Sequence, residues 1–385
     1  MIYFFILLIL LFGSINYDYY HKHNGKKIWL IFEWFLLVSV MGFRYKVGGD
    51  TLSYMDDYLT YPRLDQLRSF DFIDANYKPL WYVFCALCKS VNDSFFFFQF
   101  VHSIIVNTVI IWFLKNNTKW YFTGILLYAV FFYLNFNSEV LRAALSVCAF
   151  LLGFKFLIDQ KWVKYLIFCI IGYGFHGEAL MMLVLPLCLL MSKLRINLLT
   201  LSGIVVVSIL LLSLFSAIPY LDAFEYLSAS DMERLERHGE STGINISTMG
   251  ILAQCIFLSP IIIILYLQKD KKGFLLKGFL LLYIIISIQS VKYHVLAARL
   301  LDYLKPLLVL SIADTLYLLY GTYKIRLNKL LGEILIVVTL FTGFYQYFEG
   351  SWFPYWKRYF PYSSIFDPEE NPERDNLMYM YKIKN

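Results

Sequence analysis

Charged residues are scarce in this sequence: Asp, Glu, Lys and Arg together make up 16% of its 385 residues, against 59% hydrophobic residues. The mean hydropathy of +0.60 excludes an ordinary soluble domain. The net charge of +6 is scattered over short connections, which excludes a typical nucleic-acid-binding surface. The first residues lack a basic segment, so the sequence predicts no cleaved secretory signal there.

Cysteine is also rare, and its pattern excludes the usual metal and disulfide frameworks. Six cysteines occur, almost wholly within apolar stretches. Cys85 and Cys88 form a C-x-x-C pair, but no second Cys/His pair completes a zinc site. We therefore expect packing cysteines, no metal and no cofactor.

What the sequence has instead is long apolar runs separated by short polar connections. This pattern predicts an all-α protein, a polytopic transmembrane helical bundle of about 12 spans. The segment 79–91 is short for a crossing and opens with Lys78-Pro79, so we expect a re-entrant or interfacial helix there. The predicted spans lie near residues 1–15, 28–43, 97–114, 120–136, 139–158, 162–175, 177–191, 198–218, 248–268, 273–290, 295–319 and 330–348.

Basic residues set the expected orientation. Lysines and arginines gather in alternate connections, which the positive-inside rule places in the cytoplasm, so that both termini lie outside. The prediction is one membrane domain, 1–348, with larger outer loops at about 44–78 and 219–247. Residues 349–385 are expected to form an outer aromatic and acidic tail. The inner connections contain Lys22/Lys26/Lys27, Lys115/Lys119, Lys161/Lys164, Lys193/Arg195, Lys269/Lys271/Lys272 and Lys324/Arg326/Lys329.

Five ionisable residues at or just inside the ends of apolar runs then fall on the same outer level. They are Arg44, Asp50, Arg142, His176 and Arg299. Ionisable groups at membrane depth are costly, so they usually mark a polar cavity with a function. Their convergence predicts one site on the extracytoplasmic side.

Several short motifs contain these residues. Phe43-Arg44-Tyr45-Lys46-Val47-Gly48-Gly49-Asp50-Thr51-Leu52-Ser53-Tyr54 resembles the R-x-x-x-G-x-D-x-x-x-Y signature of the EpsG family, the Wzy-like polymerases of bacterial exopolysaccharide, capsule and O-antigen. The resemblance continues in order over most of the chain. Its further motifs are Lys78-Pro79-Leu80-Trp81-Tyr82, Leu141-Arg142-Ala143-Ala144-Leu145, Phe175-His176-Gly177-Glu178-Ala179-Leu180, Arg299-Leu300-Leu301-Asp302-Tyr303 and Pro361-Tyr362-Ser363-Ser364-Ile365. This chain departs from the family in having Lys78 where Glu is frequent, and Ala143 where Gln is frequent.

The resemblance implies a surface polysaccharide polymerase, a glycosyltransferase-type enzyme of the bacterial cytoplasmic (inner) membrane. Its substrate would be a polyprenyl-diphosphate-linked oligosaccharide in the bilayer. A chain-length regulator and a flippase of the same pathway are the protein partners that the resemblance suggests, with no nucleic acid.

The residue types fit that chemistry. Arginine suits a diphosphate through its permanent charge and fork of donors, so Arg44, Arg142 and Arg299 are candidates to hold it. Activation of an acceptor hydroxyl needs a base, for which His176 and Asp50 are the candidates. Tyr54 and Tyr303 could stack on sugars. The alternatives are structural: ion pairs of the arginines with Glu139 or Asp302, and a helix-end role for His176. Gly48-Gly49 predicts either a turn or an anion-binding nest.

Two other functions stay open at this stage. A flippase or transporter of lipid-linked oligosaccharide would also use intramembrane arginines, although the sequence shows neither the internal repeats nor the mid-bilayer charges of that class. A metal-dependent membrane glycosyltransferase would depend on Asp56 and Asp57.

Overall fold

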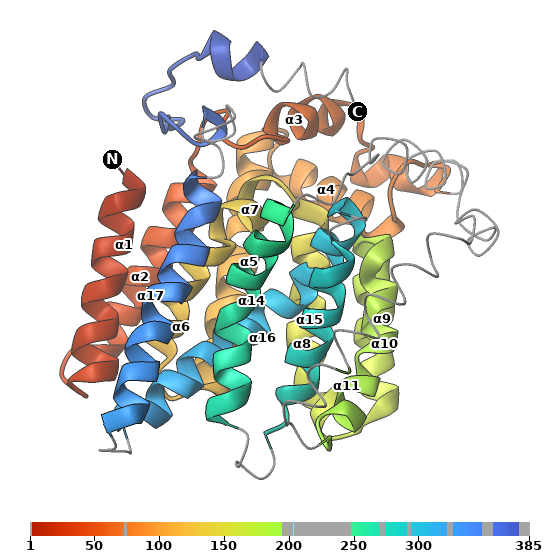
Figure 1. The fold of residues 1–385 in the computed structure, drawn as a ribbon. Coiled ribbons are helices and arrows are strands. Elements are labelled where there is room, and N and C mark those ends of the chain that lie inside the picture. Colours follow the sequence, from red (N-terminus) through yellow and green to blue (C-terminus); the bar gives the residue numbers. More distant parts are fainter. Residues whose placement is uncertain are drawn as a thin grey trace.

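Helices form nearly all of the structure. A computed structural model describes residues 2–72, 75–194, 203, 248–268, 274–290, 294–321, 326–348 and 357–376. Within these ranges no strand is formed, and extended pairing is confined to isolated bridges. Figure 1 shows a helical bundle covered at its upper end by shorter helices. The predicted all-α class is confirmed, whereas the predicted outer loop 219–247 lies outside the described residues.

Among the described residues, four helical segments are long and apolar enough to cross a membrane. They are α1 (Ile2–Gly13) with its π-helical continuation η1 (Ser14–Tyr19), α5 (Phe95–Asn117), α8 (Leu141–Ile158) and most of α16 (His294–Gly321). Beside them lie α2 (Lys26–Gly42), α6 (Tyr121–Phe131), α9 (Trp162–Phe175), α14 (Thr248–Leu267), α15 (Lys277–Gln289) and α17 (Arg326–Phe348). These helices agree with the predicted apolar segments within a few residues. The total of about 12 spans stays a prediction.

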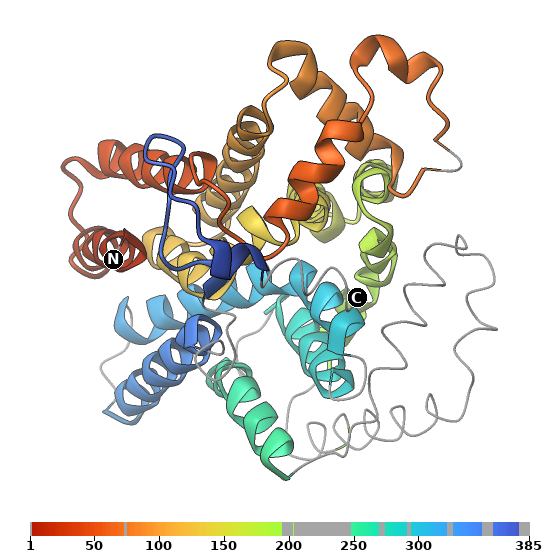
Figure 2. The same cartoon turned by 90° about the horizontal axis from the view of Figure 1, so that it is seen from above.

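The helices differ in how deeply they are buried. Of the apolar stretches of α8 and α16, 72% is buried inside the protein, against 39% for the segment formed by α1 and η1. Figure 2 accordingly places α1 at the rim and α16 near the middle. A helix that is apolar all round is expected in such an interior, whereas a rim helix exposes apolar side chains that suit lipid contact.

Two predicted spans are broken into shorter helices. The segment 120–136 becomes α6 and α7 (Tyr133–Ser138), which meet at Phe132. A buried polar ring stabilises this break: Asn137 donates to the Tyr128 hydroxyl at 2.9 Å, and Asn107 donates to Asn137 at 3.0 Å. Asn137 also donates to the backbone carbonyl of Tyr133 at 2.8 Å, so a side chain satisfies a backbone group at the break, where the membrane supplies no partner. The segment 177–191 divides into η3 (Gly177–Leu180), α10 (Met181–Val184) and α11 (Pro186–Met191), the last beginning at a proline that lacks an N–H.

Short helices cover one end of the bundle. They are α3 (Thr51–Thr60), η2 (Leu64–Arg68) and α4 (Pro79–Val91), which lie near the upper end in Figure 1 together with the described tail, residues 357–376. At about 1.5 Å per residue, the 13 residues of α4 span only about 20 Å, short of a ~30 Å hydrocarbon core. The first residues of α1 lie at this same end.

Candidate functional site

At the Gly48-Gly49 turn the first outer loop packs directly against the start of α8. Gly48 has φ +110°, and a Cβ there would lie 2.5 Å from Cβ of Ser138. The amide of Gly49 donates a 2.6 Å hydrogen bond to Oε1 of Glu139. The sequence predicted either a turn or an anion-binding nest at these glycines. In the structure they form a turn, and the anion that the Gly49 amide contacts is the protein's own Glu139 carboxylate. The turn leaves Asp50 at the position that precedes α3.

Glu139 also holds the tail. Nη1 of Arg358 lies 3.2 Å from Oε2 of Glu139, and the Tyr359 hydroxyl donates to Oε1 at 2.8 Å. Backbone bonds continue the contact, since the amide of Gly48 donates to the carbonyl of Arg358 at 2.9 Å. Further pairs join Tyr45 with Ser363, Ile365 with Phe43, and Lys46 with Glu370. The first outer loop and the tail thus form one unit, although some 300 residues separate them in sequence.

Arg142 lies in the first turn of α8 with its guanidinium on an aromatic ring. Its Cζ is 3.9 Å from the centre of the Tyr77 ring, and the Tyr77 hydroxyl donates to Oδ2 of Asp57 at 2.7 Å. Nε of Arg142 is buried and has no hydrogen-bond acceptor among the described residues. The sequence left open an ion pair of Arg142 with Glu139, but that carboxylate is held by Arg358. Stacking fixes the plane of the guanidinium while its edge keeps donors for an anion.

Arg299, Glu178 and His176 form a chain of contacts at the outer end of α9 and α16. Nη1 of Arg299 is 2.9 Å from Oε1 of Glu178, and Nδ1 of His176 contacts the other oxygen, Oε2. The structural alternative for Arg299, an ion pair, is therefore formed, but with Glu178 and not with Asp302, which pairs with Lys305 at 2.5 Å. Among the three, Arg299 keeps the most exposed side chain, at 40%.

The two halves of the cluster share one electrostatic field. The charges of Arg142 and Arg299 act on both Asp50 and Glu178. The protein atoms packed around Asp50, followed by the Glu139 carboxylate, raise the pKa of Asp50 to about 7, although its side chain still reaches solvent. Arg358, Arg299 and Arg142 act in the opposite direction. The arrangement gathers fixed cations with groups that can change protonation near neutral pH.

Arg44 and Tyr303, two of the predicted substrate contacts, lie below this surface. Arg44 is fully buried and donates to the carbonyls of Val47 at 3.0 Å and Met41 at 2.6 Å. Tyr303 is fully buried as well, and its hydroxyl lies 2.7 Å from that of Ser146. In this arrangement neither side chain presents a surface to a ligand, and Arg44 instead closes the end of α2 under the outer loop.

Tyr54, the other predicted sugar contact, faces the same interior. It is 8% exposed, and its hydroxyl donates to the carbonyl of Glu139 at 3.2 Å. Tyr54 therefore joins α3 to the start of α8, next to the cluster. Its contact with a sugar stays a prediction.

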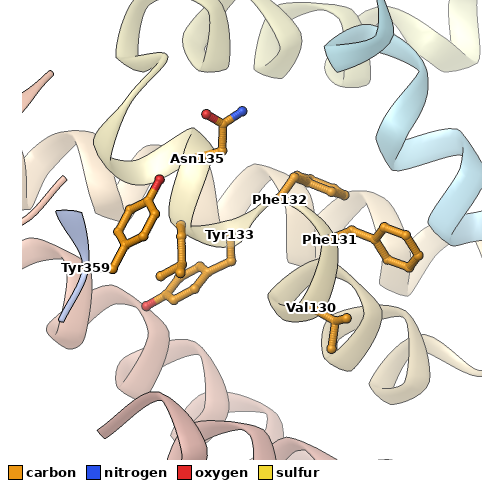
Figure 3. Close-up of a pocket in the computed structure, with 7 residues that line it drawn as sticks. Val130, Phe131, Phe132, Tyr133, Asn135 and Tyr359 are labelled. Carbon is orange, nitrogen blue, oxygen red and sulfur yellow. The ribbon is translucent and has the colours of Figure 1, made fainter. Parts of the chain in front are cut away.

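A small pocket lies beside Tyr359 of the tail. Figure 3 shows Tyr359 beside the backbone of the α6–α7 break, with Phe132, Tyr133 and Asn135 around the opening. Its volume of about 50 Å³ has room for a few water molecules and not for a sugar. Over the described ranges, no group of three or more His, Cys, Asp and Glu residues could hold a metal ion.

Sequence reasoning found the cations and the histidine, and it named Glu139 and Glu178 without their roles, but it missed Arg358 and Tyr77. Glu139, Glu178, Arg358 and Tyr77 make the contacts that hold the cluster together. A local signal existed for the two glutamates, since each lies within three residues of a motif residue at a helix end. Arg358 gave no comparable signal, because its partner is more than 200 residues away.

Comparison with known proteins gives one match. The family model described as the EpsG family matches residues 27–364, which include the whole cluster. No curated protein and no solved structure matches the chain.

Proposed function

Because this match covers most of the chain, the chain belongs to the EpsG family, and from that premise we propose that it is a polymerase of surface polysaccharide. It would transfer a growing glycan from polyprenyl diphosphate to a lipid-linked oligosaccharide repeat unit. The active site would lie on the outer face of the cytoplasmic membrane. The observation that carries this proposal is the cluster of Arg142, Arg299, His176 and Asp50 at one end of an apolar helical bundle.

The proposed chemistry assigns the cations to the donor. As the bond between the anomeric carbon and the diphosphate oxygen breaks, the electron pair leaves with the polyprenyl diphosphate. Arg142 and Arg299 would stabilise that growing negative charge, the usual role of fixed donors placed at a leaving group. Their position at the end of the helices suits a headgroup at the membrane surface, while the polyprenyl chain stays in the lipid.

A base at the same level would take the proton of the acceptor. The acceptor hydroxyl oxygen forms the new bond to the anomeric carbon, and its proton passes to His176 or to Asp50. Both are candidates because both lie beside the arginines, and a base is most effective when it titrates near the working pH. The Arg44 side chain would then support the loop that carries Asp50, without touching substrate.

The orientation follows from the basic connections. The connections after α1, α5 and α8 lie at the end of the bundle opposite α3 and α4, as Figure 1 shows. Those connections and the helix ends next to them hold most of the lysines of the N-terminal half, which the positive-inside rule predicts to be cytoplasmic. The cluster would then face outward, where no nucleotide sugar is present.

The test is the glycan carried by polyprenyl diphosphate in cells that lack this protein. Polymerisation predicts a single outward-facing repeat unit and loss of the long-chain ladder. The same unit trapped on the cytoplasmic side would show a flippase, and a normal ladder with altered sugars would show a modifying transferase. Either of these last two results refutes the proposal.

Point variants then test the site in the same cells. Arg142→Ala and His176→Ala, expressed at normal levels, should abolish or strongly shorten the polymer. Arg63→Ala is the matched control, because Arg63 lies on the same outer layer in an exposed pair with Asp93. Full-length polymer from both site variants would contradict the assignment.

A further inference from the structure

Glu178 contacts a proposed phosphate-binding residue and a proposed base at the same time. Its two oxygens are divided between them, Oε1 to Arg299 at 2.9 Å and Oε2 to His176. The glutamate side chain is 19% exposed and that of the histidine 11%, so both contacts are largely shielded from water. A single carboxylate thus links the two functions that a glycosyl transfer needs.

The contact also favours one histidine tautomer. Oε2 of Glu178 contacts Nδ1 of His176, and the amide of Glu178 lies 3.4 Å from the same nitrogen. Because a carboxylate oxygen only accepts hydrogen bonds, we assign the proton of the neutral imidazole to Nδ1, which leaves Nε2 as the basic nitrogen. Orientation of a base by a carboxylate in this way is the principle of catalytic triads.

His176 and Glu178 are close together on one short backbone segment, whereas Arg299 reaches them from another helix with a partly exposed side chain. His176 ends α9, where its amide donates to the carbonyl of Gly172 at 3.0 Å, and Glu178 follows within the single turn η3. Arg299 reaches the glutamate from α16 with a long side chain that is 40% exposed. An arriving anion can therefore draw Arg299 away, but cannot draw Glu178 away from His176.

We propose that Glu178 is a positioning residue that couples donor binding to acceptor activation. When a diphosphate binds Arg299, the guanidinium leaves Oε1 of Glu178. The full charge of the carboxylate then acts on His176, which becomes a stronger base when the donor is in place. This inference rests on the proposed function, because it takes Arg299 as a phosphate ligand and His176 as a base.

Other charges also face this trio and set its starting balance. Lys78 reaches over Gly177, the residue between the histidine and the glutamate, and Arg142 acts on Glu178 from α8. On α16, Asp302 and its partner Lys305 lie on the same side. With several cations around one shared carboxylate, a bound diphosphate changes the local balance toward proton uptake.

The first experiment measures proton uptake during anion binding. Inorganic pyrophosphate is titrated into the purified full chain in lipid nanodiscs by calorimetry, in buffers of different ionisation enthalpy, from pH 6 to 8. The expected result is uptake of a fraction of a proton per pyrophosphate bound. In Glu178→Gln that uptake falls by at least half. Pyrophosphate affinity there rises roughly two- to fivefold, since a competing ion pair of ordinary strength is lost.

Matched variants separate coupling from a general effect of charge. Glu370→Gln removes an outer carboxylate that pairs with Lys46 instead, and should keep the wild-type uptake. Glu178→Asp keeps the charge on a shorter side chain and should restore part of the uptake, which also answers the objection that Glu178→Gln merely misfolds. His176→Asn should lose the part of the uptake that depends on Glu178, even where pyrophosphate still binds. The remaining part is assigned to Asp50, whose pKa is raised to about 7 and which faces the same arginines.

Two outcomes would overturn the inference, and they differ. Normal pyrophosphate binding with unchanged proton uptake in Glu178→Gln would refute the coupling and leave the polymerase proposal intact. No pyrophosphate binding by the wild type would refute Arg299 as a phosphate ligand, and with it both proposals.

Discussion

The carboxylate of Glu139 should decide whether the outer loop and the tail stay together. It accepts from the Gly49 amide at 2.6 Å and from the Tyr359 hydroxyl at 2.8 Å, and pairs with Arg358 at 3.2 Å. In Glu139→Gln one oxygen can still accept, but the new amide turns a donor toward groups that are themselves donors. Hydrogen bonds to charged groups contribute about 1.5–3 kcal/mol each. We therefore expect local opening of this unit to become about 2–3 kcal/mol easier.

Hydrogen exchange measures that opening directly. The amides of Tyr45, Gly48 and Ile365 donate across the loop and tail contact, so they exchange only when it opens. With a factor of ten for each 1.4 kcal/mol, the expected change is roughly a 30- to 150-fold faster exchange at these three positions. Mass spectrometry of the full chain in detergent, with peptides over 43–50 and 357–366, gives the rates.

The control is the neighbouring pair of Lys46 with Glu370. Glu370 has a 57% exposed side chain, and such pairs contribute at most about 1 kcal/mol. Glu370→Gln should therefore accelerate the same amides by less than about fivefold. Equal rates in wild type and Glu139→Gln would refute the reasoning, because the tail would then be held by its backbone bonds alone.

Three further predictions concern the same surface. Gly48→Ala should destabilise the outer loop by about 1–3 kcal/mol, because the residue has a positive φ and its new Cβ would lie only 2.5 Å from Cβ of Ser138. Faster hydrogen exchange over residues 43–50 would show this loss of stability, and wild-type rates would contradict it. The pKa of Asp50 is raised to about 7, so pyrophosphate affinity should fall as pH rises through 7 and a negative charge appears beside the arginines. Asp50→Asn should flatten that dependence in the same calorimetric titration; an equally steep fall would assign it to another group. Tyr77→Ala should weaken pyrophosphate binding by about 0.5–2 kcal/mol through the lost stack with Arg142, while Tyr77→Phe, which keeps the ring, should change it little.

Much of the fold could be predicted because apolar runs and helices have the same bounds in a membrane. The range 162–175 is predicted and observed without change, and 79–91 is a short helix in both. Prediction failed where polar side chains inside the bundle replace backbone bonds. Tyr128 looks like an ordinary member of the apolar run 120–136 and Asn137 like part of the connection after it, yet their hydrogen bond stabilises the break between α6 and α7.

Among the site residues, too, the sequence indicates the charged positions but not their partners. Arg142 and His176 could be located from sequence because a charge at the end of an apolar run is costly and stands out. Arg44 met the same criterion, but its cost is offset by backbone carbonyls and not by a ligand. Sequence position cannot separate these cases, since both place a guanidinium at a helix end. Only the surroundings distinguish them: Arg44 is fully buried and donates to two backbone carbonyls, although its Nη2 has no partner among the described residues, whereas Arg142 is partly exposed.

The segment that begins at Phe43 and the segment that ends at Ile365 contact each other. The motif that begins at Phe43 supplies a glycine turn whose amides require acceptors, and the motif that ends at Ile365 returns the tail to that turn. Glu139, three residues before Arg142, accepts a hydrogen bond from the Gly49 amide of the turn and pairs with Arg358 of the tail. A substitution in any of these three segments should therefore disturb the other two, and with them the position of Asp50 relative to the arginines. Coupling of this kind makes the outer loop, the start of α8 and the tail one element of the site. The geometry of the cluster then depends on the Glu139 carboxylate, which touches no substrate in the proposed reaction.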